Sequence, residues 1–169
     1  DFADIEQPSA LGRSAASEAP SRPAGALAFL ARNETGYANL MKLASACFLK
    51  PRDLDPPHVK LDDVDALSGG LIVLTGGPSG PIDLAISEGQ PDLARARLER
   101  LHRTFGSSLY VELQRHGLQA QQDTESALLQ LAYTLGIPIV ATNECYFAKP
   151  GDYEAHDALL CIADGRYVT

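Results

Sequence analysis

The sequence predicts an α/β fold in which a parallel sheet is covered by helices, and two observations support this prediction. Short apolar segments bounded by Gly or Pro alternate with longer segments whose apolar residues recur at helical spacing. Continuously apolar strands are typical of parallel sheets that are buried on both faces. With 169 residues, of which 45% are hydrophobic, the chain is long enough to bury a full core.

The first half of the chain predicts a loop followed by two strand–helix units. Residues 1–25 are rich in Ala, Ser, Pro and Gly and read as a loop, with DFADIE as the tail of a strand. Residues 26–169 form the predicted domain. Its first elements are a strand at 26–31, a helix at 33–49, a short acidic helix at 61–67, a strand at 71–75 and a helix at 81–89.

The second half continues the same alternation. A helix is predicted at 90–106, a strand at 109–113, a helix at 121–136, a strand at 137–143 and a last helix at 150–165. Several of these helices end at Gly, which is the common residue after a helix C-terminus. The order is that of a parallel sheet built from strand–helix units, too few for a complete barrel.

Composition limits the function. The formal charge is −8 and the pI is near 4.9, so the chain is a poor general DNA-binding surface, because such surfaces depend on Lys and Arg. The three cysteines show no CxxC spacing and predict free thiols in a reducing cytoplasm. No apolar run approaches the ~20 residues of a membrane span. We therefore expect a cytoplasmic location.

Candidate site residues follow the predicted strands, because parallel α/β folds place their chemistry at the carboxyl ends of strands. That rule selects Asn33 with Glu34, the Gly76–Gly77 pair, residues 112–116 and residues 143–146. Gly76 and Gly77 either present N–H groups to an anion or form a tight turn.

Glu112 and His116 can both reach a divalent metal such as Zn²⁺ or Mn²⁺. Alternatively, Glu112 pairs with Arg115 and His116 is solvated. Glu144 is a candidate ligand or general base, or forms a glycosidase-type carboxylate pair with Glu112. On the last helix, His156 is either a ligand or a structural group.

Five segments together resemble a known family: ARNETGYANLMKLAS, GLIVLTGGPSGPI, YVELQRHG, LAYTLGIPIVATNECYF and DYEAHDALLCIADG. From Ala26 to Thr169 the chain resembles the PHP (polymerase and histidinol phosphatase) domain of the bacterial DNA polymerase III alpha subunit. The resemblance implies part of a distorted parallel (β/α)7 barrel whose N-terminal strands lie upstream of Asp1. It also implies that the parent is the replicative DNA-directed DNA polymerase.

Active PHP domains hold Zn²⁺ or Mn²⁺ at the barrel mouth and hydrolyse phosphoesters, in some polymerases as a 3′–5′ exonuclease. In others the site has decayed, and the domain supports the polymerase and docks the separate proofreading subunit. The family's His-x-His motif has no counterpart here, and its ATN-Asp-Val-His motif becomes Glu144, Cys145 and Tyr146 after ATN. A phenol ligates a divalent metal only after losing a proton with a pKa near ~10.

The resemblance therefore implies a vestigial metal site of Glu112, His116, Glu144 and His156, with Tyr146 in place of a His ligand. We expect no catalytic residue and no bound cofactor in this chain, with an active metal-dependent exonuclease as the alternative. The implied partners are the other polymerase III holoenzyme subunits, especially the proofreading exonuclease, and DNA through other domains of the parent. Exposed sheet edges also predict self-association of this chain.

Overall fold

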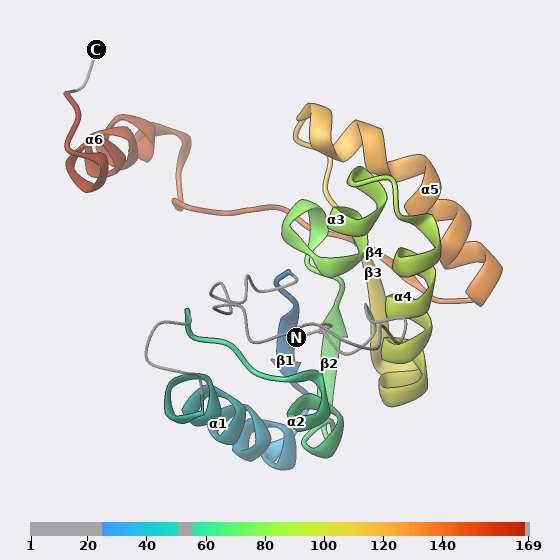
Figure 1. Ribbon diagram of the computed structural model, residues 1–169. Helices are drawn as coiled ribbons and strands as arrows, with labels where there is room; N and C mark the ends of the chain where they lie inside the picture. Colours follow the sequence, from blue (N-terminus) through green and yellow to red (C-terminus); the bar gives the residue numbers. More distant parts are fainter. Residues whose placement is uncertain (1–24, 51–55, 168–169) are drawn as a thin grey trace, which may run out of the picture.

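A central sheet with helices around it organises the chain (Figure 1). The computed structural model describes residues 25–50 and 56–167. The strand tail predicted for DFADIE and the loop predicted up to residue 24 lie outside the described residues. Within the described part, the predicted mixture of strands and helices is confirmed.

The sheet has four strands in the order β1-β2-β3-β4. These are β1 (Ala28–Ala31), β2 (Leu71–Leu74), β3 (Leu109–Leu113) and β4 (Ile139–Ala141). The pairs β2–β3 and β3–β4 are parallel, with Leu74 opposite Tyr110 and Glu112 opposite Val140. The interior strand β3 therefore carries Glu112 between two parallel neighbours.

The prediction of a wholly parallel sheet is wrong for β1, which pairs with β2 in the antiparallel direction. The connection between them turns back at one end of the sheet, where the Arg32 N–H donates to the Gly70 carbonyl (2.9 Å). The prediction that Asn33 and Glu34 lie at the shared carboxyl edge is therefore also wrong. Asn33 instead caps the next helix by accepting a hydrogen bond from the Gly36 N–H (2.9 Å).

Three helices pack against one another beside the parallel strands: α3 (Pro81–Ser87), α4 (Pro91–Phe105) and α5 (Gln119–Leu135). Pro81 and Pro91 open their helices, as expected for a residue that lacks an N–H and has a fixed φ. Helix α5 ends at Gly136, whose φ of 66° is readily adopted only by Gly. Helices α4 and α5 both contact the sheet.

Two further helices lie toward the other end of the sheet, α1 (Glu34–Leu49) and α2 (Leu61–Ala66). Helix α2 is held to α4 by polar contacts, because Arg100 donates to Asp62 (2.6 Å) and to Asp65 (2.9 Å). Helix α1 contacts β1 and β2 but buries only Gly36 and Leu43 along its length. No helix among the described residues is both long and apolar enough to span a membrane.

The core lies between the sheet and these helices. Its fully buried large side chains include Leu71, Val73, Ile82, Leu98, Leu101, Leu109, Val111 and Leu128. These side chains come from β2, β3, α3, α4 and α5, so the packed part of the molecule is centred on the two interior strands.

The C-terminal part is arranged differently. The short η4 (Pro150–Asp152) and helix α6 (Tyr153–Asp164) follow β4 through an extended connection, and α6 lies apart from the other helices (Figure 1). Neither η4 nor α6 contains a buried residue. The predicted last helix is confirmed as an element, and residues 144–167 are called the arm below.

Candidate functional site at the ends of β3 and β4

Glu112 is the central group of the candidate site. Its side chain is 7% exposed, and both carboxylate oxygens accept hydrogen bonds from the protein. The Thr142 hydroxyl donates to Oε1 (2.5 Å) and the Gly76 N–H donates to Oε2 (3.0 Å), while the Gln114 amide reaches Oε1 at 3.3 Å. These donors come from the ends of β2, β3 and β4, so Glu112 joins three neighbouring strands.

The Gly76–Gly77 pair forms a tight turn with φ values of 86° and 54°. A Cβ added at Gly76 would lie 1.9 Å from the Ala26 carbonyl oxygen, so a larger residue does not fit. Of the two alternatives that the sequence left open, the turn is the one observed. Its Gly76 N–H meets an internal anion, the Glu112 carboxylate.

His116 lies after the end of β3 and has partners on both ring nitrogens. Its Nδ1 is 3.1 Å from the Gln121 amide nitrogen, and its Nε2 is 3.3 Å from Asn143 Oδ1. The His116 backbone N–H donates to Gln121 Oε1 (2.8 Å). His116 is therefore held by the first turn of α5 on one side and by the end of β4 on the other.

Arg115 does not pair with Glu112, contrary to one alternative raised by the sequence. Its guanidinium binds Glu125 on α5 through two nitrogens, at 2.7 Å and 3.0 Å. That contact raises the pKa of Arg115 and lowers the pKa of Glu125, chiefly through the hydrogen bonds between them. Arg115 therefore does not neutralise the charge of Glu112 through an ion pair.

Asp83 is a second buried carboxylate in this region and was not predicted. It lies on α3, is 3% exposed, and accepts a hydrogen bond from the Thr124 hydroxyl through Oδ1 (2.9 Å). Among the residues that the structure describes, its Oδ2 has no hydrogen-bond partner. Burial raises the pKa of Asp83 from 3.8 to about 6, and the negative charge of Glu112 adds to that rise. Asp83, Thr124 and Glu112 line the same small polar pocket.

The arm holds the other candidate residues. The Tyr146 hydroxyl donates to Glu144 Oε2 (2.7 Å), and the Tyr146 ring lies 5.4 Å from the His156 ring, centroid to centroid. Phe147 also lies 5.4 Å from His156. The hydrogen bond to the Glu144 carboxylate raises the pKa of Tyr146, so the phenol is even less inclined to lose its proton.

The four predicted ligands are therefore divided between two places. Glu112 and His116 lie at the ends of β3 and β4, whereas Glu144 and His156 lie with Tyr146 in the arm. Across residues 25–50 and 56–167, no group of three or more His, Cys, Asp or Glu side chains is placed to hold a metal ion. The rule that functional residues lie at the carboxyl ends of parallel strands places Glu112 and His116. It does not predict the path of the chain beyond β4, where Glu144 and His156 lie.

The Zn²⁺ or Mn²⁺ that the family resemblance implies does not fit these residues as they are arranged. The Glu112 oxygens already accept protein hydrogen bonds, and the His116 Nδ1 faces an amide that donates. A ligating His ordinarily donates its second ring N–H to an oxygen. Whether the four residues bind a metal stays a prediction.

Sequence reasoning missed Thr142, Gln121 and Asp83. Thr142 directly follows β4 and lies two residues beyond Val140, the partner of Glu112, so side-chain alternation along β4 places it on the same face of the sheet as Glu112 once that pairing is known. Gln121 and Asp83 sit in the first turns of α5 and α3, near the carboxyl ends of the preceding strands. In a helical pattern both resemble ordinary surface residues.

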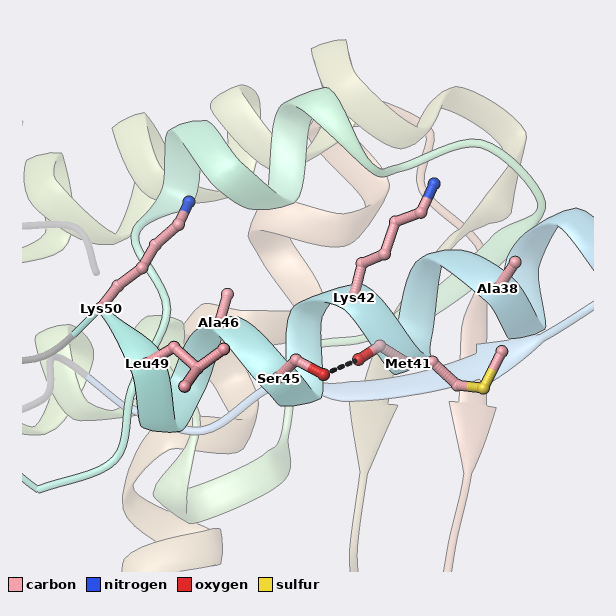
Figure 2. Close-up of a pocket in the computed structure, with 7 residues that line it drawn as sticks. All are labelled: Ala38, Met41, Lys42, Ser45, Ala46, Leu49 and Lys50. Atoms are coloured by element: carbon pink, nitrogen blue, oxygen red, sulfur yellow. Dashed lines mark hydrogen bonds between the residues drawn. The ribbon is translucent and has the colours of Figure 1, made fainter.

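A separate hollow lies on the outer face of α1, away from these strand ends. Figure 2 shows its lining, which is mainly aliphatic and includes Met41, Leu49 and the two lysines Lys42 and Lys50. The hollow measures about 450 Å³ and is open to solvent. Within the described part of the chain its lining includes no carboxylate or imidazole, so its chemistry differs from that of the candidate site.

Comparison with known proteins assigns the family. The PHP domain model matches residues 9–116, which is more than half of the chain. The chain belongs to the PHP domain family.

Its relatives are DNA polymerase III alpha subunits. The chain is 50% identical over 142 residues to that subunit from Caulobacter vibrioides, a match that covers 84% of this chain and 12% of the relative. It is 38% identical over 139 residues to the subunit from Rickettsia prowazekii, and 35% identical over 136 residues to the one from Thermus aquaticus. Each of these matches covers 80% of this chain. The chain spans about one-eighth of the length of these relatives.

Proposed function

We propose that this chain is part of the PHP region of a replicative DNA polymerase III alpha subunit, and that its phosphoesterase site is degenerate. In this proposal the domain is a structural support and a docking surface for the proofreading subunit. The four strands are then part of the family's distorted parallel barrel, with the site at its mouth. Similarity to polymerase III alpha subunits over 80% or more of the chain supports the parentage.

One observation supports the degenerate-site proposal: the candidate ligands already form hydrogen bonds with other groups of the protein. Three donors occupy Glu112, and a donor-bearing amide faces His116. In the arm, a phenol stands where the family pattern has a His, and it donates to Glu144. A metal would have to displace these contacts and bring the arm to β3 as well.

In this proposal the parent protein acts in the cytoplasm and binds DNA through other domains. Its partners are the other subunits of the polymerase III holoenzyme. Polymerisation itself belongs to other parts of that parent. Self-association of the 169-residue chain stays a prediction, supported by the exposed apolar side chains Leu159, Leu160 and Ile162 on α6. Light scattering on the concentrated chain measures it.

The test of the degenerate site uses the full alpha subunit that contains this sequence, purified without its proofreading partner. The subunit is incubated with a 5′-labelled primer on a template, without deoxynucleotides, in the presence of Zn²⁺ or Mn²⁺. We expect primer length to stay at the metal-free level.

Glu112→Ala is the matched variant, because it removes the central carboxylate of the site and no other ionisable side chain. Metal-dependent shortening that this substitution abolishes would contradict the proposal and establish the exonuclease alternative. Shortening that persists equally in the variant has a source outside this site.

A further inference from the structure

We propose that Gln121 holds the neutral His116 ring with its proton on Nε2. The ring nitrogen that faces Asn143 is then a hydrogen-bond donor and has no lone pair for a metal ion. The position of the proton follows from the hydrogen bonds alone. Its consequence for metal binding rests on the proposed function.

At the contact between His116 and Gln121, one group has a fixed polarity. The His116 backbone N–H can only donate, and it lies 2.8 Å from the Gln121 side chain, so the atom facing it is the amide oxygen Oε1. The other end of the same amide, Nε2, then faces His116 Nδ1 at 3.1 Å. An amide nitrogen only donates, so Nδ1 must accept and carries no proton.

A neutral imidazole has one ring proton, so the proton of His116 must be on Nε2. Asn143 Oδ1 lies 3.3 Å from Nε2 and is placed to accept it. Gln121 is only 6% exposed and sits in the first turn of α5, so its amide is held among packed groups. One buried side chain thus determines which of the two His116 ring nitrogens carries the proton.

This arrangement is the reverse of the one that supports a metal ligand. A histidine that ligates through Nε2 carries its proton on Nδ1 and donates it to a carboxylate, carbonyl or water. Moving the His116 proton to Nδ1 would set two donors against each other. Turning the Gln121 amide over would relieve that clash but would place its –NH₂ against the His116 backbone N–H. Gln121 is therefore a positioning residue that acts through His116.

The first experiment measures the tautomer directly in the full 169-residue chain. Two-bond ¹H–¹⁵N correlation spectra at a pH of about 8, where ordinary imidazoles are neutral, distinguish the two tautomers. The chain has four histidines, and the spectrum of His116→Gln assigns the ring in question. We expect the Nε2–H form for His116. The Nδ1–H form in the unmodified chain would overturn the proposal, and this result needs no folded variant.

The second experiment uses Gln121→Glu, which replaces the donating end of the amide by an acceptor. A carboxylate can accept from both the His116 backbone N–H and Nδ1–H, so we expect the ring to switch to the Nδ1–H form. Titration with ZnCl₂, followed at the His116 ring resonances, should then show binding at least about tenfold tighter than in the unmodified chain.

Gln122→Glu on the same helix makes the same change of charge at an exposed position and is the control. Equal Zn²⁺ responses in both variants, or an unchanged tautomer in a folded Gln121→Glu chain, would overturn the proposal. These readouts are independent of exonuclease activity. An active exonuclease would therefore refute the degenerate site without deciding the tautomer.

Discussion

The packed body and the arm hold their polar groups in different ways. In the body, Glu112 binds residues from the ends of two neighbouring strands, and Asp83 binds Thr124 on another helix. In the arm, Tyr146, Glu144, Phe147 and His156 contact one another and come from the arm alone. Every residue of α6 is at least partly exposed, whereas β3 contains only buried and half-buried residues.

This difference shows which half of the candidate site is organised by the fold. Glu112 and His116 are fixed by elements that the hydrophobic core positions, so their geometry belongs to the whole domain. Glu144, Tyr146 and His156 form a local cluster whose geometry moves with the arm. A metal centre requires both halves in one place, and only one of them is anchored.

Truncation of a leucine in each region should give the largest contrast. Leu98 on α4 is fully buried, so Leu98→Ala should lower the free energy of unfolding by about 2–5 kcal/mol through lost burial and a cavity. Leu160 on α6 is 52% exposed, and Leu160→Ala should change the free energy of unfolding by no more than about 0.5 kcal/mol. Urea unfolding curves measure both values. Equal losses would mean that α6 packs on the body.

The buried carboxylate of Asp83 should produce the next largest effect, visible as a pH dependence. The pKa of Asp83 is about 6 in the folded chain against 3.8 ordinarily, so folding favours the protonated form. Its contribution to stability is complete below pH 3.8 and is lost as the pH rises through about 6. By pH 7 the loss amounts to about 3 kcal/mol, from 2.2 pH units at 1.36 kcal/mol each.

Asp83→Asn should remove this dependence, because an amide keeps the bond from Thr124 and carries no charge. The unfolding free energy of the variant, relative to that of the unmodified chain, should therefore rise between pH 4 and pH 7. Asp164→Asn, the same substitution on exposed α6, is the control and should follow the unmodified chain. A flat difference curve for Asp83→Asn would show that Asp83 is solvated.

Apolar patterning predicted most of the body and little of the site. The bounds of β3 and the existence of α4 and α5 followed from patterns that burial itself imposes. The antiparallel direction of β1 could not be predicted, because a short apolar run looks the same in either direction. The hydrogen bond from Thr142 to Glu112 and the amide of Gln121 depend on contacts across the fold, which no local pattern records.

The smallest contrast compares one hydroxyl donor in each half of the site. Thr142→Val removes the hydroxyl that donates to Glu112 at 2.5 Å, and it leaves a buried carboxylate with one partner fewer. Since hydrogen bonds to buried charged groups contribute about 1.5–3 kcal/mol, we expect a loss near the lower end, about 1.5 kcal/mol, because Gly76 and Gln114 still donate.

Tyr146→Phe removes the matching hydroxyl in the arm, where the bond to Glu144 is exposed to water. Water replaces that donor, so the urea midpoint should not change measurably. Comparable midpoint shifts in Thr142→Val and Tyr146→Phe would mean that the arm cluster is as firmly held as the strand ends. The division of the candidate site into an anchored and an unanchored half would then be wrong.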